Sequence, residues 1–183
     1  MSELIELKCK NCGSTDLEAE NGVYVCQYCG SRFTLDPSAE AKANQYRDKM
    51  TLAMAGSDED YMNPSDEDVV DGAARRYAAV REYSDKLLEI LPNDPYGWAG
   101  RIYMRISGGI DSEESVRECI EDARKTLEYA QRYSSDEDRM DIAQFVEGNL
   151  RLYRDHILEF LASEKDKQTF RDILQRADEL AYE

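Results

Sequence analysis

Four of the five cysteines form two pairs near the N-terminus, and their spacing could hold a metal ion. Cys9 and Cys12 form one Cys-x-x-Cys pair, and thirteen residues later Cys26 and Cys29 form the second. Two residues between ligands allow a tight turn to aim both sulfurs at one ion, and four thiolates complete the tetrahedron that zinc prefers. We therefore predict a structural zinc site on these four cysteines, closed to any substrate.

Each cysteine pair is followed by glycine and serine. Gly13 follows the first pair and Gly30 follows the second, so the chain repeats the string Cys-x-x-Cys-Gly-Ser. A glycine at this place can adopt positive φ and turn the chain away from the metal. The repeat predicts two equivalent metal-binding turns, or knuckles.

Other uses of four cysteines are two disulfides, a redox pair or an iron centre. Disulfides need an oxidising compartment, and Met1–Lys10 has no long apolar stretch of the kind that marks a secretory signal. A redox Cys-x-x-Cys pair normally occurs singly in a βαβ context, which the sequence lacks. An iron centre on four cysteines remains the alternative to zinc.

The residues between and after the cysteine pairs predict a small β-structure. Asp16–Glu20 alternates in polarity, Asn21-Gly22 is a hairpin-turn dipeptide, and Val23–Cys26 is rich in β-formers. Ser31–Leu35 can add a third strand. Residues 1–36 are therefore predicted to form a zinc ribbon.

This segment resembles the zinc ribbons of the transcription-factor-IIB type. The resemblance lies in Cys-Lys-Asn-Cys-Gly-Ser at Cys9–Ser14 and in Tyr-Val-Cys-Gln-Tyr-Cys-Gly-Ser-Arg-Phe at Tyr24–Phe33. It implies the fold and a metal on Cys9, Cys12, Cys26 and Cys29. Such ribbons serve transcription, ribosomes and plain protein contacts, so the resemblance implies no single function.

The charge of the chain indicates which partners to expect. It has 39 acidic and 23 basic residues, a formal net charge of −16. Residues 1–36 contain three basic and six acidic residues, and a zinc tetrathiolate makes them more negative still. Phosphate binding needs clustered Lys and Arg, so we expect no direct contact with nucleic acid. A helix needs ~18 or more apolar residues to cross a membrane, and the sequence contains no such stretch. We expect a protein partner with a basic surface.

From Pro37 onward the sequence has the 3.6-residue periodicity of amphipathic helices. Residues 37–183 are predicted to form an antiparallel α-helical domain of about six helices, interrupted by an acidic loop around residues 56–67. The fold class is mainly α, behind a small N-terminal β ribbon. The expected helices cover about Ala39–Met54, Asp68–Leu91, Tyr96–Ile106, Glu113–Ala130, Asp136–Leu161 and Glu164–Tyr182.

One junction resembles a tetratricopeptide repeat. Tyr83–Trp98 ends one helix with Leu-Glu-Ile-Leu-Pro and places a Trp six residues after Pro92. The resemblance implies a tetratricopeptide-like helical array, in which Trp98 is mostly buried between two antiparallel helices. Ile102 and Arg105 depart from the small and tyrosine residues of the pattern, so the array is expected to be irregular.

We find no candidate catalytic residues in the sequence. It has no phosphate-binding loop, nucleophile elbow or histidine-containing metal motif. Cys119 falls on the apolar stripe of a predicted helix, and His156 is the only histidine. We therefore expect a cytoplasmic, non-enzymatic interaction adaptor or regulatory subunit. The alternative is a nucleic-acid-linked regulator that acts through the ribbon, or an acidic nucleic-acid mimic that inhibits a protein with a basic cleft.

Overall fold

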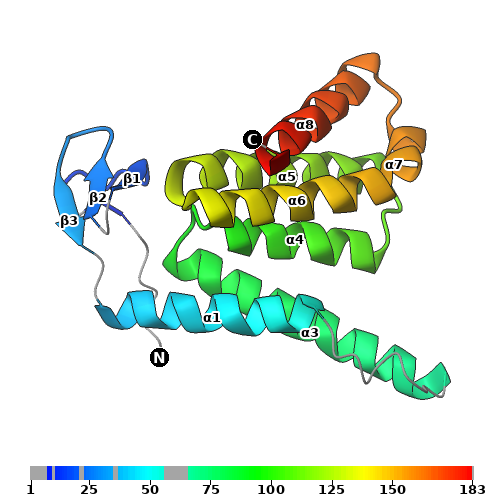
Figure 1. Cartoon of the computed structure of the whole chain (residues 1–183), viewed down its shortest axis with the longest axis horizontal. Helices are drawn as coiled ribbons and strands as arrows, with labels where there is room; N and C mark the ends of the chain where they lie inside the picture. The colour runs from blue at the N-terminus through cyan, green and yellow to red at the C-terminus, as the bar shows by residue number, and fades with distance from the viewer. Residues whose placement is uncertain (1–7, 10, 21–22, 35–36, 56–65, 183) are drawn as a thin grey trace.

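The computed structural model describes residues 8–9, 11–20, 23–34, 37–55 and 66–182. Within these ranges a small three-stranded antiparallel sheet precedes seven helices. The sheet lies at one end of the molecule, beside a stack of helices that lie roughly antiparallel (Figure 1). The prediction of a mainly α fold, with an N-terminal β ribbon followed by a helical array, is confirmed.

The three strands occupy the predicted places. They are β1 (Leu17–Glu20), β2 (Val23–Cys26) and β3 (Arg32–Thr34), in the order β1-β2-β3. The antiparallel register pairs Leu17 with Cys26 and Glu20 with Val23. The predicted turn dipeptide at residues 21–22 lies outside the described residues.

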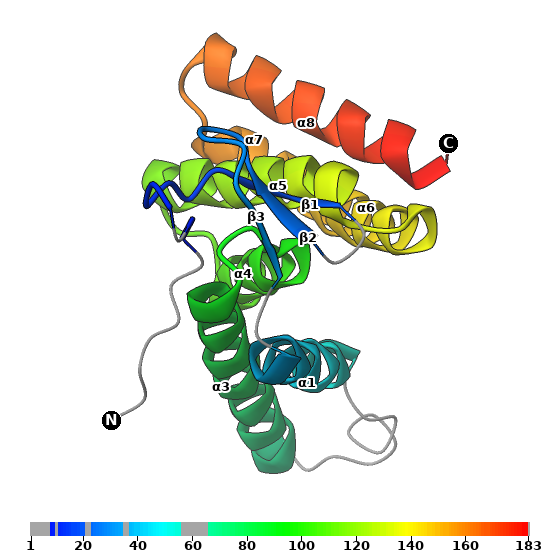
Figure 2. The same ribbon diagram turned by 90° about the vertical axis from the view of Figure 1, so that its left-hand side faces the viewer.

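The helices follow one another as neighbours in space. Helix α1 packs on α3, α3 on α4, α4 on α5 and α5 on α6, while α8 packs mainly on α6. Figure 2 shows the sheet beside this stack, with α8 at the far side from α1 and α3. The helices are α1 (Pro37–Ala55), α3 (Asp66–Ile90), α4 (Pro95–Gly108), α5 (Glu113–Tyr133), α6 (Asp136–Leu152), α7 (Arg154–Phe160) and α8 (Glu164–Tyr182).

The buried apolar residues of the described ranges form two separate clusters. The C-terminal cluster joins α4 to α8 and is built around residues such as Leu127, Leu150 and Phe170. The N-terminal cluster joins the ribbon to α1 and α3. Its buried members are Cys9, Leu17, Cys26, Ala43, Met50, Val80, Leu87 and Leu91. The ribbon and the first two helices therefore share one core, and the later helices have another.

The predicted helix that ends near Leu161 is divided in the structure. Helix α6 ends at Leu152, and Tyr153, at φ −101° and ψ 9°, leads into α7. Near the division the Asn149 side chain donates to the Phe145 carbonyl at 2.8 Å. A polar side chain that bonds back to the preceding turn favours a bend. The prediction of one continuous helix is therefore wrong, and there are seven described helices in place of about six.

The structure describes only the last two residues of the acidic loop predicted around residues 56–67. Residues 56–65 lie outside the described residues. Helix α3 begins at Asp66, inside the span assigned to the loop and two residues before the predicted start. Acidic residues favour the first turn of a helix because they complement its dipole. The end of the predicted loop is therefore helical.

Asp94 organises the turn between α3 and α4. Its side chain caps α4 by accepting from the backbone N–H groups of Tyr96 and Gly97, and Pro95 occupies the first turn. The same buried carboxylate accepts from Arg47 Nε of α1 at 2.7 Å. One side chain therefore fixes both the start of α4 and the position of α1.

The prediction that Trp98 is mostly buried is confirmed, but the ring does not belong to an apolar core. The side chain is only partly exposed, and its indole N–H donates to the Pro92 carbonyl at 2.8 Å. Lys125 Nζ of α5 lies 4.0 Å from the ring centroid, and the Arg101 guanidinium lies 5.0 Å from it. Two cations and the turn cover the ring, so Trp98 packs on the helix surface and takes no part in either apolar cluster.

Candidate metal centre

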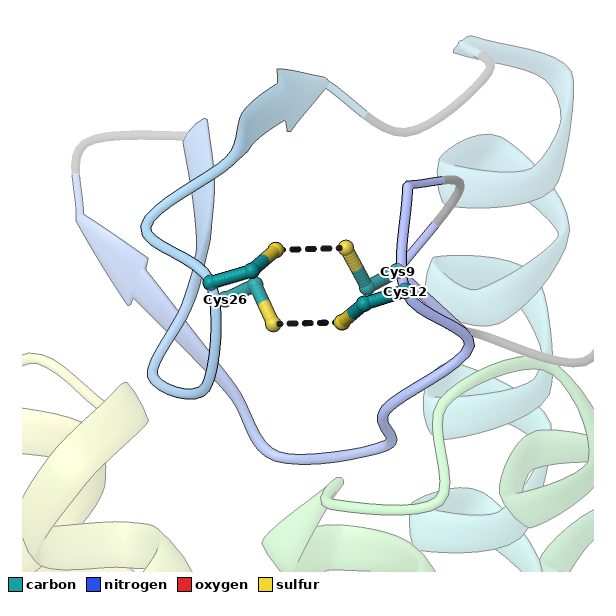
Figure 3. Close-up of side chains that lie close together, drawn as sticks. Cys9, Cys12 and Cys26 are labelled. Carbon is teal, nitrogen blue, oxygen red and sulfur yellow. Dashed lines mark hydrogen bonds between the residues drawn. The ribbon is translucent and has the colours of Figure 1, made fainter.

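The structure brings all four predicted ligands together. The Sγ atoms of Cys9 and Cys29 lie 3.5 Å apart, and those of Cys12 and Cys26 lie 3.6 Å apart (Figure 3). All four sulfurs lie within 4.8 Å of one another. A zinc ion with Zn–S bonds of ~2.3 Å gives a tetrahedron whose edges are ~3.8 Å. The cysteines are therefore placed to bind one metal ion, and their spacing fits zinc.

The two knuckles have the same backbone geometry. In each, the N–H of the glycine after the second cysteine donates at 2.8 Å to the carbonyl of the first, from Gly13 to Cys9 and from Gly30 to Cys26. The glycine φ angles are 75° and 71°, as the Cys-x-x-Cys-Gly-Ser repeat predicted. Positive φ favours glycine because it has no Cβ. The repeated sequence therefore folds into repeated ligand turns.

The thiols do not titrate alike. Hydrogen bonds from the Ser31 hydroxyl and backbone N–H lower the pKa of the Cys29 thiol to about 6. A hydrogen bond from the Ser14 N–H favours the Cys12 thiolate, but partial desolvation and the neighbouring thiols raise the pKa of Cys12 to about 12. Four thiolates this close repel one another, and a bound dication would relieve that repulsion. The donor set is suited to a cation.

One side of the four-cysteine site is buried against the helices α1 and α3. Cys9 and Cys26 are buried and belong to the N-terminal cluster, while Cys12 and Cys29 are exposed. Four protein sulfurs leave zinc no open coordination position, so a metal held here would serve the fold. Among the described residues, these cysteines are the one group of His, Cys, Asp and Glu side chains placed to share a metal.

The remaining cysteine and the lone histidine make packing and hydrogen-bond contacts within the helical part of the chain. Cys119 is buried in α5, and burial raises the pKa of its thiol to about 12. A thiol protonated at neutral pH is a poor nucleophile. The His156 ring lies on α7, where Nε2 is 2.9 Å from the Ile110 carbonyl and the ring meets Phe160 edge-on. The buried position predicted for Cys119 is confirmed.

A seam between the ribbon and the helices was not foreseen from the sequence. The Tyr133 hydroxyl at the end of α5 donates to the backbone carbonyl of Leu17 in β1, and Leu17 is 1% exposed. Beside this contact lies a cavity of about 160 Å³ with Tyr24 and Tyr96 in its walls. These tyrosines come from distant parts of the chain, so no local pattern could have joined them.

Comparison of the chain with protein-family models, curated proteins and solved structures found no match. No helix among the described residues is long and apolar enough to cross a membrane. The features that bear on function are therefore the four-cysteine site, its packing against the helices and the surface charge.

Proposed function

We propose that this chain is a non-enzymatic interaction adaptor or regulatory subunit, in which a structural zinc ribbon of the transcription-factor-IIB type is fixed to a tetratricopeptide-like helical array. The observation that carries the proposal is that Cys9 and Cys26 lie in the same buried cluster as Met50 and Leu87. A closed four-thiolate metal offers no chemistry to a substrate, and it rigidifies the surface built around it.

The helical packing supports the repeat-like part of the proposal. Each of the first helices packs on the next, and α4 contacts both α5 and α6. The turn that resembles a repeat junction is tight, because the Trp98 indole bonds back to Pro92 and Asp94 caps the following helix. Stacked helical hairpins offer extended faces to protein partners.

Surface charge supports a partner with a basic surface. Many arginines of the helices are already neutralised by carboxylates on the same surface. Arg124, for example, bonds Glu121 and Glu128 at 2.7 Å each. With 39 acidic against 23 basic residues, the carboxylates remain in surplus. Complementary charge steers association and selects the partner.

Thiolate metal ligands persist best under reducing conditions, which supports a cytoplasmic location.

An affinity experiment tests the adaptor function. The metal-loaded chain and the Cys26→Ser variant are immobilised in parallel, and proteins of the source cell are captured at physiological salt. We expect a stoichiometric protein partner on the metal-loaded chain alone, with its lysines cross-linked to acidic residues of the chain. Capture of no stoichiometric protein, or equal capture by both baits, would contradict the proposal.

A gel-shift experiment separates the adaptor from the nucleic-acid-linked alternative. We expect no measurable binding of duplex DNA or RNA near physiological salt, because the net charge is −16 and counterion release requires cationic side chains at the phosphates. A mixed-sequence duplex is titrated with the metal-loaded chain at increasing salt. Binding in the micromolar range that weakens steeply with salt would favour the alternative.

A further inference from the structure

Three tyrosines line the cavity at the seam between the ribbon and the helices. The rings come from Tyr24 of β2, Tyr96 of α4 and Tyr133 of α5. Its volume of about 160 Å³ is close to the ~150 Å³ of a protein cavity that holds benzene. The space therefore suits one compact group rather than a whole cofactor. The apolar part of the lining is supplied by Leu17, Leu91 and Pro95.

Hydrogen bonds hold two of the rings in place. The Tyr96 hydroxyl donates to Asp138 Oδ1 at 2.9 Å, and the Tyr133 hydroxyl donates to the Leu17 carbonyl. Burial raises the pKa of all three phenols, including that of Tyr24, so they are neutral at physiological pH. A ligand would thus meet rings that are already ordered, and preorganisation lowers the cost of binding.

The charged groups that line the cavity carry one surplus negative charge. Arg47 and Asp94 both line it, but they are paired with each other through Arg47 Nε at 2.7 Å. Asp138 is exposed at the rim and contributes a further negative charge. The faces of tyrosine rings carry negative potential and attract alkylammonium groups. Three tyrosines and the Asp138 carboxylate supply the groups from which a cage for such a cation is built.

We propose that this cavity binds an alkylammonium group, namely the side chain of a lysine, free or methylated, from the basic protein partner. The choice of a protein lysine as its source rests on the proposed adaptor function, whereas the affinity for an alkylammonium group does not. Two of the walls, Leu17 and Tyr24, belong to the ribbon. The cage is therefore complete only when the ribbon is seated on the helices.

Calorimetric titration of the metal-loaded chain with choline tests the proposal. The matched control ligand is 3,3-dimethylbutan-1-ol, which has the same shape but carbon in place of the charged nitrogen. We expect choline to bind at roughly millimolar concentration or below, and the neutral alcohol roughly tenfold more weakly or not at all. Equal affinity for the two, or no choline binding, would overturn the proposal, even if a protein partner is captured.

Two substitutions localise the binding. Tyr96→Ala is expected to weaken choline binding roughly tenfold or more, since it removes one ring of the cage. Asp138→Asn keeps every ring and removes only the rim charge, so it should weaken binding by a smaller factor. Tyr182→Ala changes an exposed tyrosine outside the cavity and should have no effect. Circular dichroism and zinc content confirm that each variant is folded. Unchanged affinity in both cavity variants would overturn the proposal.

Blocked lysine and trimethyllysine, as Nα-acetyl methylamides, then test the source of the cation. We expect both to compete with choline, and the methylated form to bind more tightly because it is larger and less hydrated. Choline binding without competition by either lysine would overturn the assignment to a protein side chain and indicate a small-molecule ligand. Chelation of the metal is expected to abolish choline binding, since it releases the ribbon walls.

Discussion

The Cys26→Ser variant is expected to lose its metal and the packing of the ribbon on α1 and α3, while the later helices remain folded. Structural zinc binding is worth roughly 10–16 kcal/mol in zinc-finger peptides, which is comparable to the whole stability of a domain. Because Cys9, Leu17 and Cys26 form one end of the N-terminal cluster, that cluster is opened when the ribbon unfolds. The C-terminal cluster contains no ribbon residue and should persist.

Elemental analysis and hydrogen exchange measure this outcome. The unmodified chain should carry about one zinc ion. In the variant, exchange should increase in β1 to β3, α1 and the second half of α3, while α5, α6 and α8 stay protected and most helical circular dichroism is retained. Cys119→Ala is the matched control, because it removes the cysteine outside the cluster and should keep the zinc. Iron in the unmodified chain, or no metal with four free thiols, would contradict the zinc assignment.

The Phe170→Ala variant is expected to show the converse behaviour. Phe170 is fully buried, and among the completely buried side chains that the structure describes it has the largest volume. It anchors α8 in the C-terminal cluster. Removing a buried phenyl ring should lower the free energy of unfolding by roughly 3–5 kcal/mol, through lost burial and the cavity left behind. The metal content should stay at about one zinc ion, since the ribbon belongs to the other cluster.

Denaturant unfolding, followed by circular dichroism together with metal analysis, measures this second effect. Leu152→Ala is the matched control, because Leu152 is 77% exposed and a surface substitution should change stability by about 0.5 kcal/mol or less. An unfolding free energy that is unchanged in Phe170→Ala would contradict the assigned core. Loss of zinc in that variant would show that the two clusters unfold as one unit.

Local patterns in the sequence were sufficient to predict the ligand turns and most helices. The two Cys-x-x-Cys-Gly-Ser strings each determine their own knuckle, because the ligands and the glycine lie within five residues of one another. The apolar stripe of α5 is equally local, since a period of 3.6 residues places its members on one face. The apolar residues that this period places together are all buried: Val116, Ile120, Ala123, Leu127 and Ala130.

The errors and omissions have two sources: a local interruption of a periodic helix, and contacts between distant parts of the chain. The apolar stripe continues through Tyr153, so periodicity gave no sign of the division between α6 and α7. Trp98 is suited to a core by its residue type, but Lys125 from the next helix covers its ring.

Only the tertiary structure brings Tyr24, Tyr96 and Tyr133 to one cavity and joins the ribbon to the core of α1 and α3. Local sequence determines which face of an element is apolar. Which other element covers that face depends on the packing of the whole chain, because apolar burial is not directional and depends on area and shape rather than on order along the sequence.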